Sequence, residues 1–207
     1  MLAIHATLRR ELSSIPKLVA RASELDTNDR EAVVTHWSMV SRFLTAHHSG
    51  EDEVLWPLLR QRRPEARELV DTLEAEHERL HDLIGQADEI IGSWGTEADE
   101  TEECARITAE LAETLRSHSA CEESELLPLI PGAVTADEWA QLPAHAQQAF
   151  SPPEMMTVMG MILEELPPPA KDGMLSALPE PARNAWVAFG EAQYRDYSDR
   201  IASIANG

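Results

Sequence analysis

Histidine and glutamate residues recur at intervals of four in three separate parts of the chain. Together with one histidine near the amino terminus, the candidate metal ligands are His5, His47, Glu51, His77, His81, His118 and Glu122. Residues four apart on an α-helix project from the same side, about one turn apart, so each pair can chelate one metal ion. The spacing therefore predicts metal chemistry, provided that these segments are helical.

Two of the pairs belong to an internal repeat. A histidine, a glutamate four residues later and a proline six residues after that occur twice, beginning at His47 and at His118. The offset between the two copies is 71 residues at all three positions. A single histidine–glutamate pair at this spacing is common, whereas two copies that share a downstream proline are not expected by chance.

Each candidate ligand lies in a stripe of apolar residues that recur at steps of three and four, the period of an amphipathic α-helix. The four stripes cover residues 2–22, 33–58, 66–91 and 107–129. They are separated by Asp26–Asp29, which offers helix-capping side chains, by Pro64 and by Gly92–Gly95, and the last stripe ends at Pro131 and Gly132. Four long helices with short links predict an all-α, up-down-up-down four-helix bundle over residues 1–131.

The positions of these breaks place the ligands at one height in such a bundle. Two residues on antiparallel neighbouring helices are level when the turn lies midway between them. With 49, 79 and 120 as the centres of the three ligand pairs, the midpoint of 5 and 49 is 27, that of 49 and 79 is 64, and that of 79 and 120 is 99.5. The first two midpoints fall on predicted breaks and the third falls shortly after one, which scattered surface histidines would have no reason to show.

Five histidines and two carboxylates inside a bundle are costly unless a cation compensates them. Nitrogen-rich ligation with carboxylates suits iron, and also zinc or copper, and seven side chains exceed the needs of one ion. If both glutamates bridge two octahedral ions that share an oxo or hydroxo group, eleven of the twelve coordination positions are filled. One open position on a redox-active pair is what reactions with dioxygen, hydrogen peroxide or nitric oxide require.

The ordered motif set resembles the hemerythrin-like, HHE cation-binding family over about residues 1–131. The matching residues are His5, His47, Glu51, His77, His81, His118 and Glu122. The resemblance implies two iron ions with a bridging oxo or hydroxo group, the five histidines as terminal ligands, and Glu51 and Glu122 as bridges. Hemerythrins proper carry an aspartate five residues after the last histidine, whereas Glu122 stands at four, which resembles the bacterial branch of the family.

Residues 132–207 differ in composition from the predicted bundle. They contain eight of the 13 prolines, and these separate short helices expected at about 135–148, 153–166 and 180–204. The segment 154–163 is too apolar to stand in water. We therefore expect the C-terminal helices to pack on the bundle or to form a homodimer contact with a second subunit.

The net charge of the chain is −20. Nucleic-acid backbones and anionic membrane surfaces repel such a protein, so we expect neither as a partner. The apolar runs are too short to span a membrane, and no basic-then-apolar leader precedes His5. Because two cysteines do not make a disulfide framework, we predict a cytoplasmic location.

One competing interpretation concerns the helix that carries the histidine pair. His77, Glu78 and His81 also match the H-E-x-x-H pattern of zinc metalloproteases, which needs Glu78 beside the metal as a general base. That interpretation leaves both histidine–glutamate pairs without a role, so we prefer Glu78 as a solvated flanking residue.

A second ambiguity is the register of the first pair, because His48 with Asp52 competes with His47 and Glu51. The residues around His47 are the more apolar, so we predict His47 as the ligand, with His48 at the surface or beside the ligands. The acidic residues after Glu51 and Glu122 are interpreted as solvated faces or as hydrogen-bond partners of ligand histidines. His36 is expected in the core or at its boundary, and His145 is expected to be structural.

The function that these features favour is a non-haem di-iron protein that binds or reacts with dioxygen, hydrogen peroxide or nitric oxide at one open iron site. Catalase- or peroxidase-like turnover is one form that this reactivity can take. The alternatives are an oxygen, redox or iron sensor or storage module without turnover, and a di-iron oxidase or oxygenase acting on an organic substrate. The sequence does not decide whether the protein is an enzyme.

Overall fold

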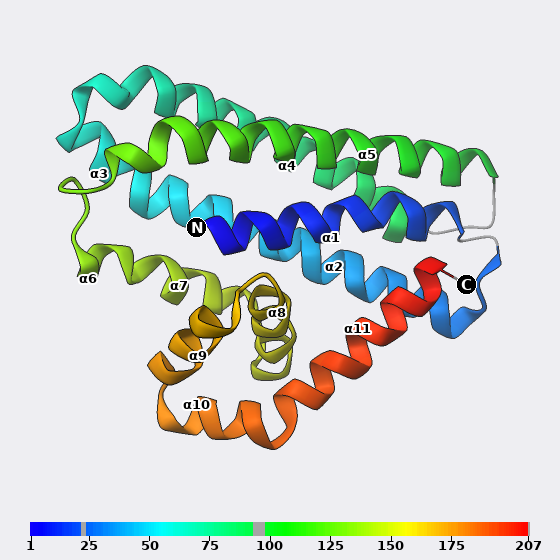
Figure 1. Ribbon diagram of the computed structural model, residues 1–207. Helices are drawn as coiled ribbons and strands as arrows, with labels where there is room; N and C mark the ends of the chain where they lie inside the picture. Colours follow the sequence, from blue (N-terminus) through cyan, green and yellow to red (C-terminus); the bar gives the residue numbers. More distant parts are fainter. Residues whose placement is uncertain (22–23, 93–97, 207) are drawn as a thin grey trace.

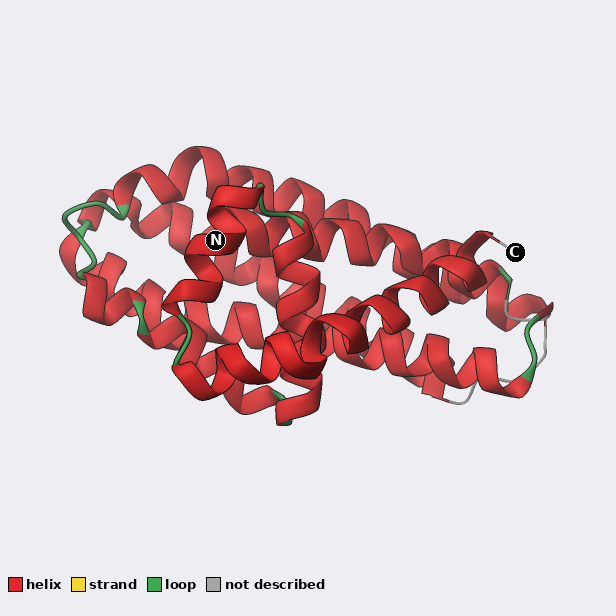
Figure 2. Cartoon of the chain, turned by 60° about the horizontal axis from the view of Figure 1, so that its bottom comes forward, coloured by secondary structure: helices red, strands yellow, loops and turns green. Residues whose placement is uncertain are grey.

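The computed structural model describes residues 1–21, 24–92 and 98–206 of the chain, and these ranges contain helices and loops but no strand (Figures 1 and 2). The long helices are α1 (Leu2–Ala20), α2 (Thr27–Gly50), α4 (Arg67–Gly92) and α5 (Ala98–Cys121). α1 packs against α2 and α5, and α4 packs against the same two helices, so the four form a closed ring of antiparallel neighbours. The predicted all-α four-helix bundle is therefore confirmed.

The predicted helix breaks have identifiable local causes. The Asp26 side chain accepts a hydrogen bond from the Asp29 backbone N–H at 2.9 Å and caps the start of α2. Pro64 begins a 3₁₀ turn, Pro64–Ala66, that joins the short helix α3 (Trp56–Arg62) to α4. The break expected at Gly92–Gly95 falls mostly on residues outside the described ranges.

Both copies of the sequence repeat adopt the same irregular helical geometry. α2 continues into a π-helical turn at Glu51–Leu55, and α5 continues into one at Glu122–Leu126. In each turn the residue before the repeated proline, Trp56 or Leu127, donates its backbone N–H to the carbonyl of the glutamate five positions earlier. The prolines have no N–H to donate, which disturbs the ordinary α-helical ladder at this point. The 71-residue repeat is therefore a repeat of structure, and it places a glutamate at the start of each turn.

The C-terminal part of the chain forms more helices than the prolines suggest. They are α6 (Ala136–Trp139), α7 (Gln141–Ala146), α8 (Pro152–Glu164), α9 (Pro168–Ala177), α10 (Glu180–Ala185) and α11 (Glu191–Asn206). The sequence analysis did not predict α9 because three consecutive prolines, Pro167–Pro169, stand where it begins. Pro167 is the N-cap residue, and Pro168 and Pro169 are the first two residues of the helix, where a missing N–H costs nothing.

The C-terminal helices cover one side of the bundle (Figure 1). α8 and α11 pack against each other and against α1 and α2, and α7 packs against α2. Val158 and Met161 of the apolar segment join the hydrophobic core of the bundle. Met159 and Leu163 instead pack with Trp186, which lies in the π-helical turn Trp186–Gly190 between α10 and α11.

The close packing of α8 on α11 depends on a glycine. A Cβ atom at Gly160 would lie 2.1 Å from Cγ of Tyr194, so the Gly160→Ala variant has to move the ring. We expect a loss of about 1–3 kcal/mol in the free energy of unfolding, measured by urea denaturation. The matched control is Gly173→Ala in α9, where a Cβ meets nothing within 4 Å and where alanine should stabilise the helix by about 0.5–1 kcal/mol. Equal effects of the two variants would contradict the packing argument.

Candidate metal centre

Two clusters of buried side chains lie next to each other inside the bundle. The first, here called the His5 cluster, contains His5, His47, Glu51 and Glu122. The second, the three-histidine cluster, contains His48, His77 and His118. Within each cluster, one potential ligand atom from every residue lies within 4.8 Å of all the others.

The His5 cluster has the spacing of ligands around one ion. Nε2 of His5 lies 3.1 Å from Nε2 of His47 and 3.2 Å from a carboxylate oxygen of Glu122. Nε2 of His47 lies 3.6 Å from the nearer oxygen of Glu51. Two nitrogen ligands about 2.1 Å from one metal ion at right angles are about 3 Å apart, so these distances suit a shared ion.

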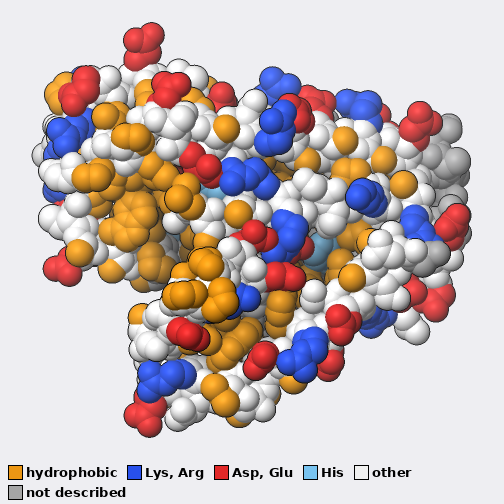
Figure 3. Space-filling model, viewed as in Figure 1, with side chains coloured by type: hydrophobic (Ala, Val, Ile, Leu, Met, Phe, Trp, Pro, Cys, Tyr) orange, Lys and Arg blue, Asp and Glu red, His pale blue; other side chains and the backbone are white. Residues whose placement is uncertain are grey.

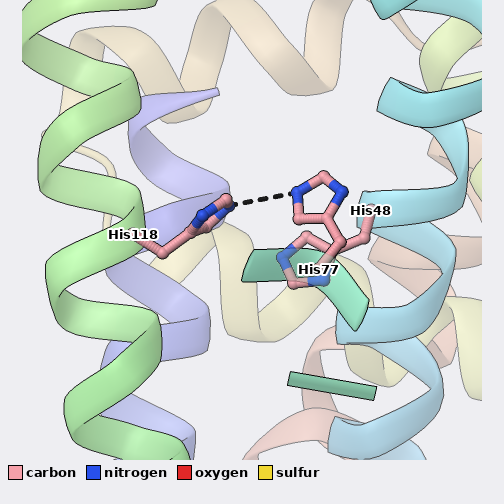
Figure 4. Close-up of side chains that lie close together, drawn as sticks. All are labelled: His48, His77 and His118. Atoms are coloured by element: carbon pink, nitrogen blue, oxygen red, sulfur yellow. Dashed lines mark hydrogen bonds between the residues drawn. The ribbon is translucent and has the colours of Figure 1, made fainter. Parts of the chain in front are cut away.

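The three-histidine cluster brings together rings from α2, α4 and α5 (Figure 4). Nε2 of His77 lies 3.1 Å from Nε2 of His118, and the ring of His48 stacks on that of His77 with centroids 4.0 Å apart. Nε2 of His48 is buried and has no hydrogen-bond partner among the described residues. A metal ion is a natural partner for three imidazoles that converge in the interior of the bundle.

Glu51 and Glu122 connect the two clusters. Oε1 of Glu51 lies 3.6 Å from Nε2 of His47, and Oε2 lies 3.7 Å from Nε2 of His77 in the other cluster. Oε2 of Glu122 lies 3.2 Å from Nε2 of His5 and 3.6 Å from Nε2 of His118. All four carboxylate oxygens are buried and have no hydrogen-bond partner among the described residues. Such oxygens are costly in a protein interior unless they bind a cation, so the donor set fits a pair of metal ions.

The protonation states of the site also favour metal binding. Burial raises the pKa of Glu51 well above its ordinary value, and the charge of Glu122 raises it further. Burial lowers the pKa values of His47 and His48 well below theirs, with neighbouring histidines adding to the effect. Neutral imidazoles keep a lone pair for a metal ion, and cations would relieve the repulsion between the two glutamates.

Carboxylates outside the clusters orient three of the ligand rings. Nδ1 of His5 is 3.0 Å from Glu123, and Nδ1 of His77 is 2.8 Å from Asp52. Nδ1 of His118 is 2.8 Å from Glu76. A proton on Nδ1 that is held by a carboxylate leaves Nε2 free to face a metal ion. Asp52 and Glu123 directly follow the two repeated glutamates, as the sequence analysis allowed, whereas Glu76 was missed because it is not part of the repeat.

Removing one of these outer carboxylates should weaken metal binding. We expect Glu76→Ala to reduce affinity at the three-histidine cluster by about 10–100-fold, because the ring of His118 loses the group that orients it. The control is Glu78→Ala, which changes an exposed glutamate on the other side of His77. Competition titrations with a chelator measure both affinities, and equal loss in the two variants would contradict the assigned role of Glu76.

The structure places two histidines differently from the sequence analysis, and the choice of metal ligands between them stays a prediction. His48 is only 6% exposed and belongs to the three-histidine cluster, although we expected it at the surface or beside the ligands. His81 is exposed and lies in neither cluster, although we expected it beside His77. The buried positions of α4 include Val70, Leu73, His77, Leu80 and Ile84, so His81 follows a core position and turns away from the interior. Because Glu78 is also exposed, the zinc-protease interpretation is not supported.

The two remaining histidines lie where the sequence analysis expected them. His145 is half-buried, and its Nε2 is 3.0 Å from the Ser49 hydroxyl. His36 is fully buried, and its Nδ1 forms a hydrogen bond with the Tyr197 hydroxyl of α11. Neither is part of the two clusters.

The burial of His36 predicts a specific pH dependence of stability. Burial, with a contribution from Arg10, lowers the pKa of His36 to about 4, while an unfolded histidine titrates near 6.5. Between these values the unfolded chain binds a proton that the folded chain does not. His36 therefore stabilises the fold above pH 6.5, and that stability is lost as the pH falls toward 4, by up to about 3 kcal/mol. We expect urea denaturation of His36→Gln to show a shallower pH dependence than the wild type, whereas His81→Gln should match the wild type; an unchanged slope in His36→Gln would contradict this assignment.

A buried, nitrogen-rich ligand set inside a four-helix bundle defines a cation-binding bundle protein. The family model described as the hemerythrin HHE cation binding domain matches residues 1–130, and the chain belongs to this family. Searches of curated proteins and of solved structures found no match. None of the described helices combines the length and the apolar character needed to cross a membrane.

Proposed function

We propose that the chain is a non-haem di-iron protein that reacts with dioxygen, hydrogen peroxide or nitric oxide. The observation that carries the proposal is the four buried carboxylate oxygens of Glu51 and Glu122, which face both histidine clusters and have no other described partner. Bound iron would supply redox chemistry that the side chains themselves lack.

The two clusters would offer their ions different numbers of ligands. His48, His77 and His118, one oxygen from each glutamate and a bridging oxo or hydroxo group make six donors. His5 and His47 with the same shared groups make five, which leaves one position open on an octahedral ion. The small ligand would therefore bind on the side of the His5 cluster.

The residues of this chain have separable tasks in such a centre. The five buried histidines would hold the ions, and Asp52, Glu76 and Glu123 would orient three of the rings by accepting a hydrogen bond from Nδ1. All members of both clusters are buried, and this surrounding would strengthen the attraction between the glutamates and the ions.

Metal analysis combined with a visible spectrum tests the proposal. We expect about two iron ions per chain, near-ultraviolet absorption of an oxo-bridged ferric pair, and a change in the spectrum when azide or hydrogen peroxide is added. Oxygen release from peroxide would identify catalase-like turnover. A colourless protein that holds only zinc and does not respond to azide would overturn the proposal.

A further inference from the structure

A partly enclosed cavity of about 180 Å³ adjoins the His5 cluster. Among the described residues that line it, the ionisable groups belong to His47, Glu51 and the amino terminus at Met1. The bundle contributes apolar walls through Ile4 and Phe43. The cavity therefore touches the His5 cluster, and apart from His47, Glu51 and the amino terminus at Met1 its lining side chains are apolar.

The opposite wall of the cavity comes from the C-terminal helices. Trp139 at the end of α6 and Leu142, Pro143 and Ala146 of α7 line it. These residues lie beyond residues 1–130, which the family model matches, so this wall is not part of the shared domain. Figure 3 shows hydrophobic side chains gathered over the part of the surface where α6 and α7 lie beside the bundle.

The wall is held in place by contacts between α7 and α2. Nε2 of His145 lies 3.0 Å from the hydroxyl of Ser49. Gly50 has no side chain, and a Cβ there would touch Leu142 and His145 at ordinary contact distances of 3.7 and 3.6 Å. α7 therefore lies directly on the turn of α2 that leads into Glu51.

The size of the cavity exceeds what a diatomic ligand needs. A cavity of about 150 Å³ lined by aliphatic and aromatic side chains is large enough to bind benzene. A volume of about 180 Å³ therefore accommodates a ring-sized organic molecule beside the cluster. Because the walls are apolar, such a molecule has to be apolar on the side that faces α6 and α7.

We propose that this cavity binds a small apolar organic molecule, of the size of benzene or toluene, and holds it against the His5 cluster. This inference rests on the proposed function for the chemistry that the molecule would meet there, and it names the class of substrate. Binding of such a molecule beside the His5 cluster favours an oxidase or oxygenase over a carrier of dioxygen alone.

Binding of toluene to the metal-loaded protein tests the inference, with calorimetry as the readout. We expect the wild type to bind toluene and the Ala146→Phe variant, which fills the cavity, to bind it at least tenfold more weakly with unchanged metal content. The matched control is Ala144→Phe, the same substitution at an exposed position of α7, which should bind like the wild type. Equal binding by the two variants would overturn the inference.

A second measurement does not depend on any variant folding. Nuclear Overhauser effects between toluene protons and the indole of Trp139 would place the molecule in the cavity, and their absence in the toluene-saturated protein would overturn the inference. The azide response is recorded on the same sample. Azide response without toluene binding leaves the proposed function intact and rejects the cavity site, whereas toluene binding at Trp139 without azide response supports the cavity site and rejects the iron chemistry.

Discussion

His48→Ala is expected to lose the metal ion held by the three-histidine cluster, whereas His81→Ala is expected to retain both ions. Nε2 of His48 is buried without a described hydrogen-bond partner, and its ring stacks on His77. Removing a ligand should weaken binding by more than the roughly 10–100-fold that follows from losing a group that merely orients one. We therefore expect the metal content after dialysis to fall from about two ions per chain to one or fewer.

The comparison of His48→Ala with His81→Ala separates a buried cluster histidine from an exposed one. Both variants remove one imidazole from the same height of the bundle, but His81 is exposed and lies outside both clusters. Elemental analysis after dialysis against a weak chelator measures the outcome. If His81→Ala loses metal and His48→Ala does not, the ligand set is the one that the sequence pattern suggested, and the clusters in the structure do not represent the metal-bound state.

The sequence could not decide between these histidines for a physical reason. A spacing of four identifies residues on one side of a helix. A pair of ions, however, extends over a larger region than a single ion, so neighbouring residues that point in different directions can each contact one of them. The adjacent residues His47 and His48 of α2 both face the interior, one toward each cluster. The apolar stripe favoured His47 over His48, although the structure buries both side chains.

Other features of the fold were accessible from the sequence to different degrees. The four bundle helices were predicted because their apolar stripes are long and their breaks contain capping residues and prolines. The repeat indicated that Glu51 and Glu122 are equivalent, but not that each begins a π-helical turn, since that geometry depends on backbone hydrogen bonds. Glu76 could not be recognised because its role depends on the distance to His118 on another helix.

The C-terminal helices show a further limit of sequence patterns. Their composition predicts helices and breaks, but the apolar residues of α7 do not reveal which surface they cover. Only the packing of α7 on α2 brings Leu142 and Ala146 to the cavity beside Glu51. The division of the chain into two domains at residue 131, which rests on composition, therefore stays a prediction. Residues before and after this boundary both line the cavity.

Glu51→Gln is expected to change stability in opposite directions with and without metal. In the metal-free protein, glutamine removes a buried carboxyl group that has no described hydrogen-bond partner and that is repelled by Glu122. We expect the free energy of unfolding to rise by about 1–3 kcal/mol, because the desolvation cost of a charge is larger than that of an amide. With metal present, glutamine lowers stability, because Glu51 faces both clusters and both ions lose a charged donor.

The loss of stability expected for Glu51→Gln in the presence of metal follows from the coupling of metal binding to folding. A ligand at a thousand times its dissociation constant stabilises the folded state by about 4 kcal/mol, and weaker binding removes part of that stabilisation. Urea denaturation with iron and with a chelator measures both values. The control is Glu53→Gln, which removes the same charge two residues away at an exposed position and should change neither value appreciably. If Glu51→Gln changed the free energy of unfolding with the same sign in both conditions, the buried carboxylate would serve the fold rather than the metal. The effect of the substitution reverses sign on removal of the ion only when the carboxylate is a ligand that is strained without its ion.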